Sequence, residues 1–358
     1  MRSKSSMMIG AAVASMLIIP AVAGDNGWVV WPTKTVQGTN ALRVEDVIGS
    51  LRVNVANGPM KVDVSGAREM VAGLNVRSDG GTLRITGSEI TNVNVWDWKH
   101  WFDFSNIRDD NDHNGKLFIK VTVPKGTSVR IDDLIGNATV CDTYGPLTME
   151  TTAGDATVGK VAQAHITLAG SGKTAVNEVG GELHIEIAGS GHMTANRVGS
   201  VRAEIAGSGD TQIGTIAGGA SIDIAGSGDF SARTVNGPVK VDIAGSGTVK
   251  IADGMATPLH VDIIGAGDLF FGGTAVDPAI SAMGSGNVHI KRYTGNLSND
   301  GMADVVIGDK AYPANPPVPP APPAPPGAHL PPLPPAPPAP PAPPAPPHHH
   351  SDDDGDDN

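Results

Sequence analysis

The sequence predicts an all-β fold, specifically a right-handed, single-stranded parallel β-helix in which similar coils of chain stack along one axis. The first observation is a glycine triplet, Gly-Ser-Gly or Gly-Ala-Gly, that recurs at intervals of 18 to 20 residues. Its copies begin at Gly170, Gly189, Gly207, Gly226, Gly245, Gly265 and Gly284. Such a repeat is typical of solenoids, whose units bury their apolar faces only against their neighbours. The right hand follows from the general preference of parallel crossover connections.

The second observation is a strict alternation of apolar and polar residues before each triplet. The positions two and four residues before the first glycine are apolar in every copy, as in Ile224 and Ile222, whereas Asp223 between them is polar. A period of two indicates a strand with one buried face. Another apolar column follows the triplets, at Val176, Ala195, Ile213, Ala232, Ile251, Phe271 and Ile290. Each repeat is therefore expected to contain two strands, a tight glycine corner and a looser corner.

Composition and charge support this fold class and disfavour several functions. The 358 residues include 46 glycines, and only 4% are aromatic, which is an unusual balance for an enzyme core. The formal net charge is -12, and an acidic chain without a basic stripe repels nucleic acid. Cys141 is the single cysteine, so no disulfide can form within the chain.

Five segments are expected along the chain. Residues 1–23 combine a basic start, a short apolar run and an Ala-x-Ala ending, as in a cleaved signal peptide. We therefore expect export to the periplasm, the outer surface or the medium, and no transmembrane segment in the mature chain. Residues 28–130 are expected to form an N-terminal β cap region, and residues 131–308 the β-helix. The proline-rich composition of residues 309–347 predicts a polyproline II spacer. Residues 348–358 are expected to form an acidic tail rich in His and Asp.

Three segments resemble a known family. They are the recurrent Ile-x-Ile-Ala-Gly-Ser-Gly-Asp of residues 222–229, Gly-Gly-Thr-Leu-Arg-Ile at 80–85, and Leu-Phe-Ile-Lys-Val-Thr-Val-Pro at 117–124. Together they resemble the bacterial head GIN domain family of autotransporter-type adhesins, over about residues 41–308. This resemblance implies an exported right-handed β-helix with an adhesive or envelope role and no established catalytic activity.

Polar columns on the outer face of the predicted strands form the first candidate site. An acidic column lies three residues before the glycines, at Glu186, Glu204, Asp223, Asp242 and Asp262. Two residues earlier the chain carries His184, Arg202, Ser221, Lys240 and His260. Stacked carboxylates about 5 Å apart repel one another unless cations screen them. The two columns thus predict either an ion-pair ladder that fixes the register or a cation-binding stripe.

A tryptophan cluster forms a second candidate, for ligand binding. Trp96, Trp98 and Trp101 alternate with charged residues. Exposed aromatic rings of this kind can stack on sugars or anchor a protein surface, so the expected partner is a glycan or an envelope or surface protein. The alternative is that this segment closes the N-terminal end of the solenoid.

The next segment is a candidate calcium loop. Asp110, Asp112 and Asn114 supply oxygen ligands at alternating positions, and Gly115 follows where such a loop turns sharply. Val121 stands where a bidentate glutamate would complete the motif. The alternatives are a calcium site and an ordinary polar turn, and no other cofactor is expected.

Two functional classes follow from these features. The first is a non-enzymatic envelope or secreted protein that presents a rigid rod for adhesion or scaffolding. The second is a carbohydrate-active enzyme, a polysaccharide lyase or hydrolase, because some β-helices carry such activities. Catalysis requires groups that converge in one groove, whereas the outer carboxylates here repeat evenly. The sequence therefore favours the non-enzymatic class.

Overall fold

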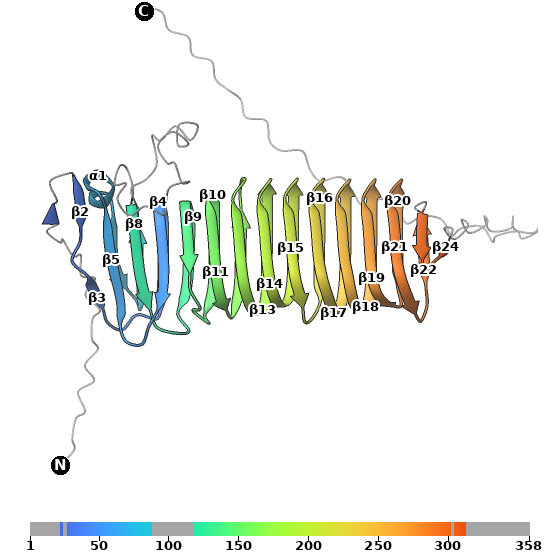
Figure 1. Ribbon diagram of the computed structural model, residues 1–358, viewed down its shortest axis with the longest axis horizontal. Helices are drawn as coiled ribbons and strands as arrows, with labels where there is room; N and C mark the ends of the chain where they lie inside the picture. The colour runs from blue at the N-terminus through green and yellow to red at the C-terminus, as the bar shows by residue number, and fades with distance from the viewer. Residues whose placement is uncertain (1–21, 24–26, 88–116, 302–303, 313–358) are drawn as a thin grey trace, which may run out of the picture. The chain divides into compact units, whose positions relative to one another are not determined.

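The computed structural model describes residues 22–23, 27–87, 117–301 and 304–312. These residues belong to one compact unit, Met1–Asn315, and form a stack of strands with one short helix (Figure 1). Within the described residues, no helix has the length and apolar character to cross a bilayer. The predicted acidic tail and nearly all of the predicted signal peptide lie outside the described residues, as does the predicted proline-rich spacer from residue 313 onward. Residues 309–312 of that segment are described, and Lys310–Tyr312 form a short β-strand.

The N-terminal elements are β1 (Val22–Ala23), β2 (Trp28–Val30), β3 (Lys34–Val36), β4 (Ala41–Val55), β5 (Met60–Ala67), α1 (Arg68–Ala72), β6 (Asn75–Asp79), β7 (Thr82–Thr86) and β8 (Leu117–Val123). The repeat region contains β9 (Ser128–Val140), β10 (Pro146–Ala153), β11 (Asp155–Val161), β12 (Gln163–Leu168), β13 (Lys173–Gly189), β14 (His192–Gly207), β15 (Asp210–Ile216), β16 (Ala220–Gly226) and β17 (Asp229–Gly245). The C-terminal elements are β18 (Thr248–Gly265), β19 (Asp268–Val276), β20 (Ala279–Gly284), β21 (Asn287–Thr294), β22 (Ser298–Gly301), β23 (Asp304–Ile307) and β24 (Lys310–Tyr312).

The strands stack in parallel as coils of a solenoid of about nine turns, which confirms the predicted fold class. Residues one repeat apart are direct partners on neighbouring strands, for example Ile205 with Ile224 and Ile224 with Ile243. Both apolar columns before the glycine triplets are buried, with no side chain more than 2% exposed. Burying an aliphatic side chain contributes about 1.5 to 3 kcal/mol, so the repeated columns form the main stabilising core.

Each coil contributes a third buried apolar side-chain position, which the sequence pattern did not predict. Beyond the second predicted strand, the chain bends and pairs again, as in Val179 with Val198 and Ile216 with Val235. These four side chains are at most 1% exposed and form a third apolar column. The coil therefore buries side chains from three directions, which fills its interior with aliphatic residues.

The corner glycines are required by the close approach of successive coils. Gly245 has a φ of 135°, and a Cβ placed on it would overlap the carbonyl oxygen of Gly226 on the preceding coil. That oxygen accepts a hydrogen bond from the backbone N–H of Ser246 at 2.8 Å. Glycine is the residue that tolerates both the backbone angle and the contact.

The parallel stack extends further toward the N-terminus than the predicted boundary at residue 131. β4 pairs in parallel with β9 from Ala41 opposite Ser128 to Val53 opposite Val140. On its other side, β4 pairs in parallel with β7 and β8. The antiparallel strand β5 pairs with β8, and β6 with β7, so these strands and α1 lie at the N-terminal end of the stack (Figure 1).

Candidate functional site: the polar face of the solenoid

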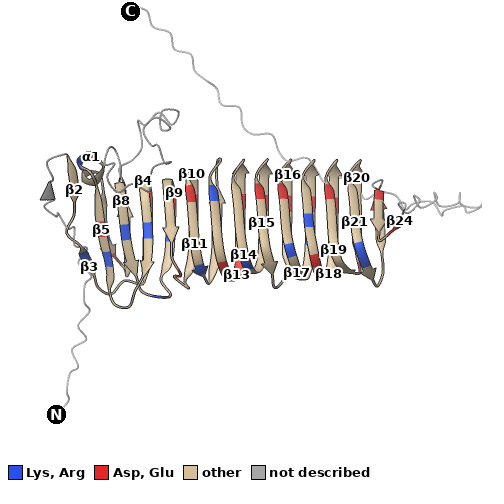
Figure 2. Cartoon of the chain, viewed as in Figure 1, with Lys and Arg blue, Asp and Glu red and all other residues tan. Residues whose placement is uncertain are grey.

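The polar face of the solenoid is the outward surface of the strands that precede the glycine corners. The structure pairs Glu186 with Glu204, Glu204 with Asp223, Asp223 with Asp242, and Asp242 with Asp262 on successive strands. The neighbouring column, from His184 to His260, is stacked in the same way. Both predicted columns therefore exist as continuous rows across the strands, and Figure 2 shows charged residues recurring along the stack.

Ion pairs connect the two columns. Arg202 Nε lies 2.8 Å from Glu204 Oε1, and Lys240 Nζ pairs with Asp242 Oδ2. In each pair the cation and the carboxylate stand two residues apart on one strand, so their side chains point to the same side. A hydrogen bond from Arg202 is the main cause that lowers the pKa of Glu204. These contacts fit the predicted ion-pair ladder.

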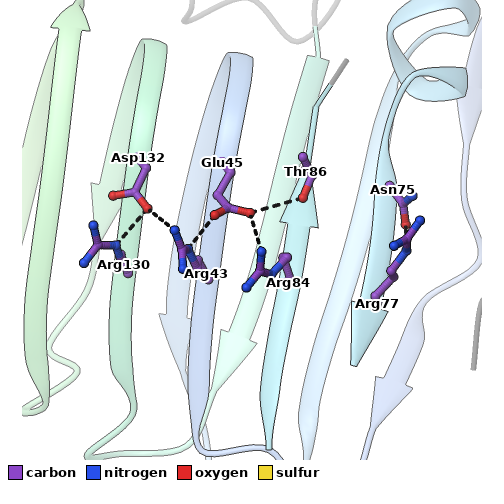
Figure 3. A network of polar contacts seen from close by, with 8 residues as sticks. All are labelled: Arg43, Glu45, Asn75, Arg77, Arg84, Thr86, Arg130 and Asp132. Carbon is purple, nitrogen blue, oxygen red and sulfur yellow. Dashed lines mark hydrogen bonds and ion pairs between the residues drawn. The ribbon is translucent and has the colours of Figure 1, made fainter. Parts of the chain in front are cut away.

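The ladder continues through the N-terminal coils (Figure 3). Arg43 on β4 is the partner of Arg84 on β7 and of Arg130 on β9. Its guanidinium pairs with Glu45 and lies 3.3 Å from Asp132 Oδ2. Arg84 reaches Glu45 at 3.2 Å, and Arg130 reaches Asp132 at 2.8 Å. Arg43 and Glu45 of β4 thus join charged groups of three neighbouring strands.

Carboxylates are less well compensated in the middle of the polar face. Burial is the largest cause that raises the pKa of Asp223, and a hydrogen bond with Asp242 adds to it. For Asp242, burial acts in the same direction, but hydrogen bonds from Lys240 and Asp223 outweigh it and lower the pKa. The two aspartates therefore differ in proton affinity although they occupy equivalent positions.

A shallow groove of about 740 Å³ runs along the acidic column. Its lining includes a row of small residues one position after each buried isoleucine, among them Ala206, Ala225 and Ala244. This row ends at Ile264, which is 65% exposed and is paired with Met283, which is 60% exposed. The groove is thus lined by a row of carboxylates and a row of small residues, and it has an apolar end.

One group on the polar face has the donor atoms for a metal ion. Among the described residues, His165, His184 and Glu186 are the set whose potential ligand atoms all lie within 4.8 Å of one another. His165 stands at the same repeat position as His184, 19 residues earlier, and is its direct strand partner. The basic column predicted from sequence starts at His184 and omits His165, although the equal spacing identifies it.

The other predicted sites cannot be placed in this structure. Trp96, Trp98 and Trp101 lie outside the described residues. The same holds for the proposed calcium ligands Asp110, Asp112 and Asn114. Both therefore stay predictions from sequence.

Comparison with known proteins gives the family. Residues 44–254, more than half of the chain, match the family described as "Putative auto-transporter adhesin, head GIN domain". The chain belongs to this family. The matched range of this head GIN domain protein begins in β4, which agrees with the early start of its parallel stack. The sequence matches none of the curated proteins compared with it.

Several solved structures are similar to this head GIN domain protein. A "putative adhesin" from Parabacteroides merdae is 15% identical, with a TM-score of 0.38, over 80% of this chain and 98% of the other. A "putative adhesin" from Parabacteroides distasonis is 16% identical, with a TM-score of 0.36, over 79% and 95%. A "putative lipid binding protein" from Parabacteroides distasonis is 16% identical, with a TM-score of 0.36, over 80% and 96%.

Proposed function

We propose that this protein is a non-enzymatic, exported adhesive or scaffolding protein whose polar face binds a glycan or an envelope or surface protein. The observation that carries the proposal is the uninterrupted repetition of the polar face, together with membership of an adhesin family. A rigid row of equivalent groups provides many similar contacts to an extended partner. Catalysis instead needs a few dissimilar groups that converge on one bond.

The charge of the groove indicates what kind of surface it recognises. Five carboxylates of the acidic column face two permanent cations, Arg202 and Lys240, so this part carries a net charge of 2 − 5 = −3 with histidine neutral. A partner that presents cationic or hydrogen-bond-donating groups complements this surface. The exposed Ile264 and Met283 add an apolar contact at the end of the groove. Because the charged contacts are exposed, binding is expected to weaken as salt concentration rises.

The test is a binding screen combined with an assay for turnover. The purified full chain is applied to a glycan array and to immobilised envelope proteins, and each bound polysaccharide is then tested for new reducing or unsaturated ends. Binding without new ends supports the proposal, whereas enzyme-dependent new ends would support the polysaccharide lyase or hydrolase instead.

A pair of variants assigns any binding to the groove. Asp242→Asn together with Ile264→Ala should weaken binding by at least about tenfold, because each change removes one kind of groove contact. Asp210→Asn, on a strand that does not line the groove, serves as the matched control. Equal loss in the control would show that the groove is not the binding surface.

A further inference from the structure

The histidine pair on the polar face has an arrangement that ion pairing alone does not explain. The rings of His165 and His184 meet edge to face, with centroids 4.5 Å apart. Their Nδ1 atoms lie 3.1 Å from each other. The two residues are held there by direct parallel pairing of β12 and β13, so their backbone positions are fixed by the solenoid.

The opposite nitrogens of both rings face carboxylates. Glu186 Oε1 lies 3.6 Å from His165 Nε2 and 3.4 Å from His184 Nε2. Glu204 Oε1 lies 3.6 Å from His184 Nε2 on its other side. The His184 Nε2 atom is buried and makes no hydrogen bond of good geometry, so these carboxylates are the groups that compensate it.

The carboxylates favour a proton on the ring nitrogen that lies nearest to them. A neutral imidazole has one N–H. When an acceptor holds this proton on one ring nitrogen, the other nitrogen presents its lone pair. The charge of Glu186, close to Nε2 of both rings, favours the Nε2–H form, and Thr167 Oγ1 lies 3.4 Å from His165 Nε2 as a further possible acceptor. At 3.1 Å the two Nδ1 atoms either share one proton in an N–H···N hydrogen bond or, with both rings in the Nε2–H form, present two lone pairs to one cation.

The separation of the two Nδ1 atoms suits a metal ion. Ligands about 2.1 Å from an ion stand about 3.0 Å apart at a right angle and about 3.4 Å apart at the tetrahedral angle. The observed 3.1 Å lies between these values. Histidine ligands commonly donate their second N–H to a carboxylate, which orients the ring and makes the ligating nitrogen more basic. Glu186 is the carboxylate beside Nε2 of both rings, at 3.6 Å from His165 and 3.4 Å from His184.

We infer that His165 and His184 bind a divalent transition-metal ion through their Nδ1 atoms, with Glu186 as the positioning residue that orients both rings through Nε2. Imidazole ligands select ions of the Zn²⁺, Ni²⁺ and Cu²⁺ class over Ca²⁺ and Mg²⁺. The remaining coordination positions belong to water or to a donor from a bound partner. The nearby cation Arg202 is paired with Glu204 at 2.8 Å, which reduces its repulsion of the ion.

The experiment measures Zn²⁺ binding by isothermal titration calorimetry with the full chain. The three histidines of the acidic tail are themselves potential ligands, so every protein carries H348Q, H349Q and H350Q as a common background. In this background we expect one Zn²⁺ site. His165→Gln and His184→Gln should each weaken that site by at least about tenfold. Glu186→Gln should weaken it by about tenfold to 100-fold, as is usual for groups that orient a metal ligand.

His260→Gln is the matched control, because His260 belongs to the same column but has Lys240 as its strand partner on one side and Ala279 on the other. It should leave the Zn²⁺ affinity unchanged. The proposal is overturned if the background protein binds no Zn²⁺, or if His165→Gln and His184→Gln bind as well as the control. Circular dichroism of each variant verifies folding, and the Glu186→Gln result stands by itself if a histidine variant fails to fold.

The imidazole ¹⁵N resonances of the background protein test which atoms bind. On addition of Zn²⁺, the Nδ1 resonances of His165 and His184 should shift while both Nε2–H protons are retained. Shifts at Nε2 would overturn the assignment of the ligand atoms and the role of Glu186.

Discussion

Asp223 and Asp242 are direct partners on adjacent parallel strands, so their carboxylates face each other on the polar face of the solenoid. Burial and the neighbouring carboxylate both raise the pKa of Asp223. A group whose folded-state pKa is raised stabilises the fold at pH values below its unfolded pKa and loses that contribution as pH rises through the folded pKa. The ionised Asp223 is therefore a local source of instability at neutral pH.

The first prediction is that Asp223→Asn stabilises the protein at neutral pH. Asparagine keeps a hydrogen-bond donor toward Asp242 and removes the repulsion, and the gain should be about 0.2 to 1 kcal/mol. The gain should shrink at acidic pH, because the raised pKa of Asp223 lets the wild-type carboxyl become protonated there. Urea denaturation at both pH values measures it, with Asp253→Asn on an exposed position of β18 as the control. A less stable Asp223→Asn protein at neutral pH would contradict this account.

The second prediction concerns the glycine corner. Gly245→Ala places a methyl group against the carbonyl oxygen of Gly226 at a φ of 135°, so the free energy of unfolding should fall by about 1 to 3 kcal/mol. Gly180→Ala is the control, because a Cβ there would meet nothing closer than the carbonyl oxygen of Ala162 at 3.7 Å. Thermal and urea denaturation should separate the two variants clearly. Equal stability of both would show that the corner can open without cost.

The features predicted from sequence are those that repeat locally. Ile222 and Ile224 are buried as predicted, because period-two alternation directly reports the inward face of a strand. The third column, for example Val198, was missed because the chain bends before it and the alternation breaks. His165 was missed although its distance from His184 is a full repeat.

Other features of the polar face depend on contacts that the sequence does not display. β4 and β9 are direct neighbours, yet four of the described strands and α1 lie between them in sequence, so no short period links Arg43 to Arg130. Likewise, residue spacing places His165 beside His184 but does not determine which ring nitrogens face each other. That depends on side-chain torsions and on the position of Glu186.

The third prediction tests the arginine that joins the N-terminal coils. Arg43→Gln removes the cation shared by Glu45 and Asp132, whose side chains are only 14% exposed, and should destabilise the protein by about 1 to 2 kcal/mol. Arg77→Gln is the control, since Arg77 is exposed and bonds only the side chain of Asn75 among the contacts drawn in Figure 3. Urea denaturation measures both. If Arg43→Gln loses no more stability than Arg77→Gln, the network does not link the strands energetically.

The fourth prediction concerns a polar atom inside the solenoid. Thr211 is 2% exposed, and its Oγ1 is buried without a hydrogen-bond partner in the described structure. Its strand partners are the buried Met193 and Phe230, so the hydroxyl faces apolar neighbours. Burying an unpaired hydroxyl costs about 1 to 3 kcal/mol, and valine has nearly the same shape with a methyl group in its place. Thr211→Val should therefore raise the free energy of unfolding by about 1 kcal/mol.

The matched control for this change is Thr194→Val, because Thr194 Oγ1 donates a hydrogen bond to the carbonyl oxygen of Thr174 at 3.4 Å. Losing that donor should offset any gain from the added methyl group, so Thr194→Val should be neutral or destabilising. Urea denaturation of the two variants isolates the effect of hydrogen bonding from that of side-chain shape. A destabilised Thr211→Val protein would mean that the Thr211 hydroxyl has a hydrogen-bond partner in solution. Water would then reach the interior of the coil despite the packing of Met193 and Phe230.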